Sequence, residues 1–152
     1  MHSIRQGAAA ELWQSLVREG SQRSGQPLEE MQESYLVFML LRHQGDAHLL
    51  ARTQALEFLE AQQAGFSLRA DALRDVGDRC LLIAGLYPEY ARRRVGVEYF
   101  IDLGRGAYRD VADASRAGYA ELFALLSNTY HALVRTLQAV RALPGASTPL
   151  AH

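Results

Sequence analysis

The sequence lacks lysine altogether and has only one cysteine. All 16 basic residues are therefore arginine, which we attribute to codon preference rather than to selection for the bidentate anion binding of the guanidinium group. Cys80 has no second cysteine with which to form a disulfide, and its apolar neighbours are typical of a thiol that packs as a small hydrophobic group. We therefore expect a cytoplasmic protein in a reducing compartment.

Long apolar stretches and a strong charge of either sign are also missing. The longest uninterrupted apolar run, residues 35–41, is far shorter than the roughly 20 residues of a membrane-spanning helix. Residues 1–7 do not contain the basic and apolar segments of a signal peptide, so we expect neither export nor membrane association. The net charge of −1 provides no long-range attraction for nucleic acid.

What the chain does contain is typical of one globular domain, with 49% apolar and 22% charged residues over a length of 152. Glycine and proline divide it into six helical segments, over about 8–19, 27–43, 46–64, 68–86, from 88 onward and 116–143. The sequence thus predicts an all-α, single-domain bundle of five to six helices. This helical domain covers residues 1–143, and a flexible C-terminal tail covers 144–152.

The most apolar segment is expected to lie at the centre of this bundle. Residues 35–41 would be apolar on every side of a helix, and such a helix needs neighbours all round it. The bundle is therefore predicted to have a central hydrophobic helix here. The expected core residues are Leu36, Phe38, Met39, Leu40 and Leu126.

Glycines are concentrated in the fifth segment. Gly96, Gly104 and Gly106 interrupt its bulky side chains, and each glycine costs about 1 kcal/mol relative to alanine inside a helix. Packing has to compensate for this cost. We therefore predict that another helix approaches the fifth segment closely.

A homodimer is the expected assembly. Residues 80–87 are also apolar around the whole helix, yet a bundle of this size covers all sides of only one or two helices. We expect Leu82, Ile83 and Leu86 to be partly exposed on the monomer and buried between two copies. The glycine-rich fifth segment is the next candidate surface.

Two acidic motifs resemble those of MazG-type nucleotide pyrophosphohydrolases. The first is Glu29-Glu30-x-x-Glu33, and the second is Asp75-Val-Gly-Asp78 followed by apolar residues. In that family, which is all-α and oligomeric, E-E-x-x-E and E-x-x-D carboxylates hold Mg²⁺ against a triphosphate. Hard cations of this kind favour oxygen ligands and bridging phosphates. The resemblance implies a Mg²⁺-dependent nucleotide hydrolase.

The chain departs from this family pattern, and its acids also have a structural interpretation. Asp75 stands where the family has glutamate, and the gap from Glu33 to Asp75 is wider than usual. Glu57 and Glu60 fit the usual spacing better, but this pair lacks the aspartate. Carboxylates also favour the first turn of any helix, and Asp75 and Arg79 have the i,i+4 spacing of an ion pair on a solvated face.

Other site chemistries have less support in the sequence. A di-iron site needs Glu-x-x-His pairs, which do not occur, and His43 and His48 are too far out of phase to bind zinc from one helical face. His131 is expected on a polar face of the last segment. The arginines at 92–94 are expected early in the fifth helix, where cations oppose the helix dipole. Anion binding, pairing with acids and simple exposure remain open for them.

A helix-turn-helix over the third and fourth segments would place Asp71 and Arg74 at apolar positions, so no nucleic acid partner is expected. We assign no catalytic residue, no cofactor and no resident metal.

Three functions remain open. The first hypothesis is a non-enzymatic interaction or regulatory module that acts as a homo-oligomer and has a possible protein partner. The alternatives are the Mg²⁺-dependent pyrophosphohydrolase and a carrier of a small apolar ligand.

Overall fold

The computed structural model describes residues 2–46, 49–50 and 53–146, and all regular structure in this part of the chain is helical. The predicted all-α class is confirmed, whereas the expected number of five to six helices is wrong. The described residues form α1 (His2–Arg23), α2 (Glu30–His43), α3 (Gln54–Gln63), α4 (Phe66–Leu86), α5 (Pro88–Arg94), α6 (Val97–Ala114), α7 (Ala117–Asn128), α8 (Tyr130–Arg141) and the 3-10 turn η1 (Pro144–Ala146). None of these helices combines the length and the hydropathy needed to cross a membrane.

Two of the predicted segments are each divided into two helices. Gly96 separates α5 from α6 with a φ of 107°, a conformation that L side chains rarely adopt. Thr129 separates α7 from α8, and its hydroxyl donates a hydrogen bond to the Leu125 carbonyl at 2.7 Å. Such a side-chain bond competes with the regular backbone ladder, which explains a break that no glycine or proline signals.

Other helix ends differ from the sequence prediction as well. α1 continues through Gly20, where an added Cβ would overlap the Val140 side chain of α8. α2 begins at Glu30 rather than at Pro27, and the Gln32 side chain accepts a hydrogen bond at 2.8 Å from the backbone N–H of Glu29. α3 begins only at Gln54. Of the residues predicted to start this helix, 47–48 and 51–52 lie outside the described part.

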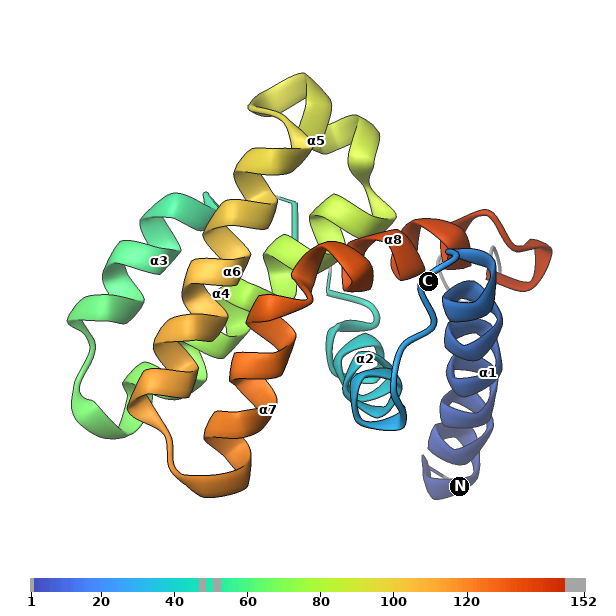
Figure 1. Cartoon of the computed structure of the whole chain (residues 1–152), viewed down its shortest axis with the longest axis horizontal. Coiled ribbons are helices and arrows are strands. Elements are labelled where there is room, and N and C mark those ends of the chain that lie inside the picture. Colours follow the sequence, from blue (N-terminus) through green and yellow to red (C-terminus); the bar gives the residue numbers. More distant parts are fainter. Residues whose placement is uncertain (1, 47–48, 51–52, 147–152) are drawn as a thin grey trace.

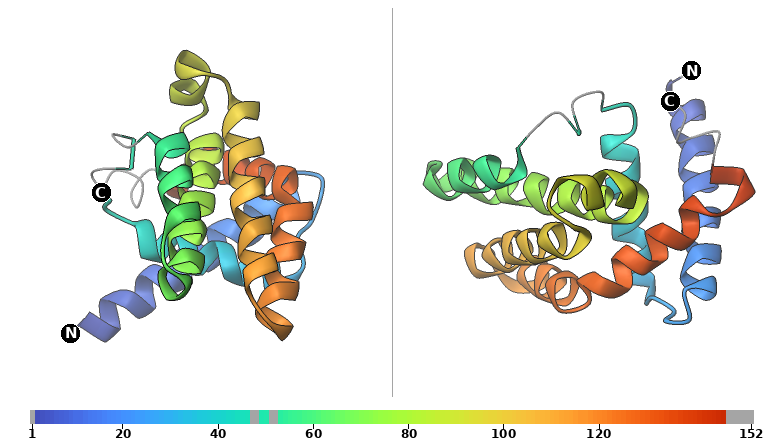
Figure 2. Two further views of the ribbon diagram at one scale, coloured as in Figure 1. Left: turned by 90° about the vertical axis from the view of Figure 1, so that its left-hand side faces the viewer. Right: turned by 90° about the horizontal axis from the view of Figure 1, so that it is seen from above.

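α4 is the central helix of the fold (Figure 1). It packs against α3, α5, α6 and α8, while α7 lies beside α6. The view from above in Figure 2 shows α3 with α4 in one layer and α6 with α7 in the next, with α8 running from α7 towards α1. Since α2 packs mainly on α1, the prediction that residues 35–41 form the central helix is wrong.

The predicted core is confirmed except at Phe38. Leu36, Met39, Leu40 and Leu126 are buried, whereas Phe38 is 52% exposed. Phe38 lies on a side of α2 that the described helices leave largely uncovered. The apolar pattern could not reveal this, because it records the character of a helix but not the number of its neighbours.

The close approach predicted for the glycine-rich segment is confirmed in α6. A Cβ at Gly104 would overlap the Tyr130 hydroxyl of α8 and would lie 3.0 Å from the Cβ of Cys80 in α4. α4 has the same feature at Gly77, where the ring of Tyr108 occupies the space of a side chain. Glycines on both helices therefore allow α4, α6 and α8 to meet closely.

Two further expectations are corrected by burial. Leu82, Ile83 and Leu86 are 3%, 1% and 4% exposed, because α4 is covered by its own chain along this length. Residues 80–86 are therefore all buried and are not available as the predicted dimer surface. The predicted tail is packed in its first residues, since Pro144–Ala146 form a 3-10 turn and Ala146 is fully buried. The rest of that tail, 147–152, lies outside the described residues.

Candidate functional site

The most polar part of the interior is centred on Asp78 of α4, whose side chain is completely buried. Its Oδ1 accepts hydrogen bonds from the hydroxyls of Tyr35 and Tyr108, each at 2.6 Å. Its other oxygen, Oδ2, lies 3.1 Å from Nε2 of His43. Asp78 thus connects α4 to α2 and α6, and these partners replace the water that a buried carboxylate loses.

The two tyrosines act as donors because their hydroxyls keep their protons. Burial raises the pKa of Tyr35 and of Tyr108, and the negative charge of Asp78 raises both further. Tyr130 lies next to them, and burial raises its pKa as well. Its hydroxyl donates to the backbone carbonyl of Gly77 at 2.8 Å, one residue before Asp78.

The rings of these tyrosines fill the surrounding core. Tyr108 meets Phe123 and Tyr130 edge to face, with ring centroids 5.3 and 5.5 Å apart. Tyr35 meets Phe123 in the same way at 5.4 Å. Edge-to-face contacts of this kind add to the stabilisation from burial. Aromatic side chains therefore fill the core around Asp78.

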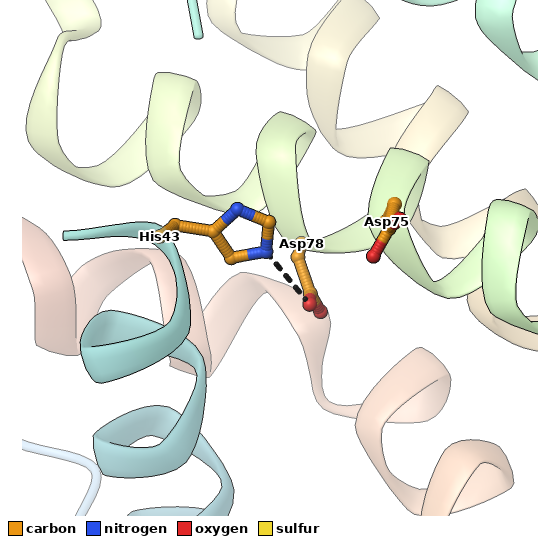
Figure 3. A group of neighbouring side chains, drawn as sticks. All are labelled: His43, Asp75 and Asp78. Carbon is orange, nitrogen blue, oxygen red and sulfur yellow. Dashed lines mark hydrogen bonds and ion pairs between the residues drawn. The ribbon is translucent and has the colours of Figure 1, made fainter. Parts of the chain in front are cut away.

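Asp75 lies one turn before Asp78 on the same side of α4 (Figure 3). Its carboxylate forms an ion pair with Arg42 of α2, and both side chains are partly exposed. The ligand atoms of His43, Asp75 and Asp78 all lie within 4.8 Å of one another. The expected i,i+4 pair between Asp75 and Arg79 does not form in the described structure, because Asp75 pairs across to α2 instead.

The structure does not bring the two MazG-like motifs together. Glu30 and Glu33 line a depression with Arg18 of α1, apart from Asp75 and Asp78. Glu29 precedes α2 and acts as its N-cap. These acids have the positions that the structural interpretation gave them, at the start of a helix, where carboxylates interact favourably with its dipole.

Glu57 and Glu60, in contrast, do lie near the acids of α4. Both line a depression between α3 and α4, to which Asp75 and Arg79 also contribute. The short connection between Gln63 and Phe66 makes α3 and α4 antiparallel neighbours. Glu57 and Glu60 of α3 therefore share one depression with Asp75 of α4. Of the acidic motifs in the sequence, this pair is the one that meets the second motif.

The remaining sequence candidates, the arginines at 92–94 and His131, lie on α5 and α8. Arg92, Arg93 and Arg94 lie in the last turn of the short α5, where cations interact favourably with the helix dipole. Their expected position at a helix start was wrong because α5 ends at Arg94 and α6 is a separate helix. His131 lies on the surface, where its Nε2 is 3.2 Å from a carboxylate oxygen of Glu98.

Sequence analysis missed His43, Tyr35 and Tyr108 as neighbours of Asp78. Spacing along one segment relates His43 only to His48, whereas its contact with Asp78 joins α2 to α4. One signal was available: a tyrosine in the middle of a buried helix needs a partner for its hydroxyl. Both Tyr35 and Tyr108 are of this kind, and the acids of α4 were candidate acceptors.

Comparison with known proteins finds no relative of this chain. No family model, no curated protein and no solved structure matches it. The resemblance to MazG-type enzymes therefore rests on the short motifs alone.

Proposed function

We propose that this protein binds a divalent transition-metal cation with His43, Asp75 and Asp78. The observation that carries the proposal is the distance of 3.1 Å between His43 Nε2 and Asp78 Oδ2. Two ligand atoms each about 2.1 Å from one metal ion, at an angle of about 95°, would be about 3.1 Å apart. The Asp75 carboxylate lies within reach as the third ligand.

The surroundings of these ligands support the same proposal. Ligating carboxylates are usually held in place by further hydrogen bonds, and the tyrosines on Oδ1 of Asp78 leave Oδ2 directed at His43. One imidazole and two carboxylates suit Mn²⁺ or Zn²⁺ better than Mg²⁺, which seldom takes a nitrogen ligand. The proposed cation is therefore a transition metal.

Metal binding would require two local changes. Arg42 would release Asp75, at small cost because an ion pair between partly exposed side chains contributes about 0 to 1 kcal/mol. His43 would have to bind the metal through an unprotonated ring nitrogen. Neither change disturbs the tyrosines that hold Asp78.

Thermal unfolding with Mn²⁺, Zn²⁺ and Mg²⁺ tests this proposal. Metal at roughly 100 times its Kd should raise Tm by about 5 to 10 °C, with Mn²⁺ or Zn²⁺ effective below the concentration at which Mg²⁺ acts. Asp75→Asn should abolish the shift, and Asp71→Asn, at an exposed acid of the same helix, should retain it.

An unchanged Tm with all three metals, or equal shifts in both variants, would refute the metal site. The pyrophosphohydrolase alternative predicts another result. Mg²⁺ would then support hydrolysis of a nucleoside triphosphate, and Glu57→Gln would abolish this activity.

A second proposal concerns self-association through the outer face of α3. Leu56 and Leu59 lie three residues apart on this helix and are both 55% exposed. Neighbouring exposed leucines favour contact with a second copy, which would bring the same face in a symmetric dimer. The proposed function is still that of a homo-oligomeric interaction or regulatory module. The proposed dimer interface is the outer face of α3 instead of residues 80–87.

Light scattering at micromolar concentration tests the dimer. A particle of twice 16.9 kDa is expected, and Leu59→Glu should convert it to a folded monomer. Leu12→Glu, at an exposed leucine of α1, is the matched control and should leave the dimer intact. A monomeric wild-type protein would rule the dimer out.

A further inference from the structure

Arg79 of α4 is nine-tenths buried and forms no ion pair with the described residues. The residue as a whole is only 9% exposed, and the Nε atom of its side chain is buried without a hydrogen-bond partner. Within residues 2–46, 49–50 and 53–146 no hydrogen bond or ion pair to its guanidinium is found. A largely buried charge of this kind is costly unless it is paired, and so the guanidinium is suited to bind an anionic group.

The guanidinium borders the depression between α3 and α4, which has a volume of about 260 Å³. Three of the residues that line it have small side chains, Ala61, Ala64 and Ala72. Sites for drug-sized ligands have volumes of about 300 to 1,000 Å³. The depression therefore suits a small metabolite.

The charges around the depression restrict the chemistry of such a ligand. Glu57 and Glu60 of α3 and Asp75 of α4 line it together with Arg79. A simple anion would be repelled by the three carboxylates, and a simple cation would leave Arg79 unpaired. A ligand with both kinds of charge satisfies both sets of residues.

We infer that this depression binds a small amino acid that carries a second ammonium group. The carboxylate of the ligand pairs with the Arg79 guanidinium, and its ammonium groups pair with Glu57 and Glu60. Arg79 can form two parallel hydrogen bonds to a carboxylate, which orients the ligand. The inference does not rest on the metal proposal, although Asp75 borders both sites.

The binding experiment uses L-lysine as the probe and is performed calorimetrically on the full chain in EDTA, so that metal makes no contribution. L-Lysine should bind, and both cadaverine, which lacks the carboxylate, and inorganic phosphate should bind at least about tenfold more weakly. Arg79→Met should weaken L-lysine binding by about tenfold or more, as should Glu57→Gln combined with Glu60→Gln. Arg69→Met, at an exposed arginine of α4, should not change it.

The ligand-free protein gives a second readout. Because Arg79→Met removes an unpaired buried charge, it should leave the urea midpoint unchanged or raise it. A lower midpoint would show that the guanidinium has a partner within the chain and would overturn the inference. Absence of L-lysine binding, binding that Arg79→Met leaves unchanged, or preferential binding of phosphate would overturn it as well.

Discussion

Asp78 and Arg79 are neighbours on α4, and both are at least nine-tenths buried, yet their surroundings differ. Asp78 faces α2 and α6 and has two hydroxyls and an imidazole as partners. Arg79 faces the depression beside α3 and has no partner in the described part of the chain. A buried charge with a full set of partners holds helices together, whereas one without partners is suited to receive a ligand. The two sides of α4 should therefore respond differently to substitution.

The largest difference is expected from Asp78→Ala. This change leaves the hydroxyls of Tyr35 and Tyr108 buried without an acceptor, and it should lower the free energy of unfolding by about 3 to 5 kcal/mol. Asp75→Ala, at a partly exposed residue, should lower it by less than about 1 kcal/mol. Urea denaturation measures both values. A loss below about 1 kcal/mol for Asp78→Ala would show that its network does not hold α2 and α6 to α4.

Alanine substitutions at two glycines of α6 compare a tightly packed contact of this helix with an open one. Gly104 faces the Tyr130 hydroxyl and Cys80, so that Gly104→Ala should destabilise the protein by about 1 to 3 kcal/mol. Gly106 faces α3, where the nearest atom to an added Cβ is a ring carbon of Phe58 at 3.9 Å. Gly106→Ala should therefore gain up to about 1 kcal/mol from helix propensity. Equal effects in thermal denaturation would contradict the difference in packing.

Alkaline pH should act mainly through the buried tyrosines at and beside Asp78. The pKa values of Tyr35, Tyr108 and Tyr130 are raised in the folded protein, while the unfolded chain titrates near the ordinary value of 10.0. Their contribution is fully present below pH 10 and is lost as the pH rises above it, because only the unfolded chain then releases these protons. The expected loss is about 1.4 kcal/mol per pH unit for each tyrosine.

Absorbance at 295 nm, recorded together with circular dichroism, checks this expectation. The buried tyrosines should ionise only when the helical signal is lost, and Tyr108→Phe should reduce the pH dependence by the share of one tyrosine. Complete ionisation of all seven tyrosines in a protein that is still folded would contradict it.

The smallest effect is expected from Phe38→Ala on α2. Phe38 is 52% exposed, so that its truncation should cost about 1 kcal/mol or less, and not the 3 to 5 kcal/mol of a buried phenylalanine. Met39→Ala, at a fully buried neighbour, should cost about 2 to 5 kcal/mol. A larger loss for Phe38 in urea denaturation would mean that the outer side of α2 is covered in solution.

The sequence predicted the helices better than their arrangement. Apolar spacing, together with the positions of glycine and proline, predicted helical segments along most of the described chain. The buried Leu36, Met39 and Leu40 were also predicted correctly. The central position of α4 was missed, because an all-apolar stretch shows only that a helix avoids water. Phe38 was misplaced for the same reason.

The candidate site was harder to predict, since its residues are distant in sequence. The bonds from Tyr35 and Tyr108 to Asp78 span 43 and 30 residues. From local spacing, the acids of α4 were interpreted as exposed residues near the start of a helix, although Asp78 is fully buried. The pairing of Glu57 and Glu60 with Asp75 across α3 and α4 was missed too, because it depends on which helices become neighbours.

The position of Cys80 has a consequence for how the folding of this protein can be followed. The thiol is the only one in the chain, it is fully buried between α4 and α6, and burial raises its pKa. A reagent that attacks the thiolate can reach it only after α4 separates from its neighbours. The rate of its modification therefore records how often the centre of the molecule opens, and no engineered label is needed to measure this kinetic stability.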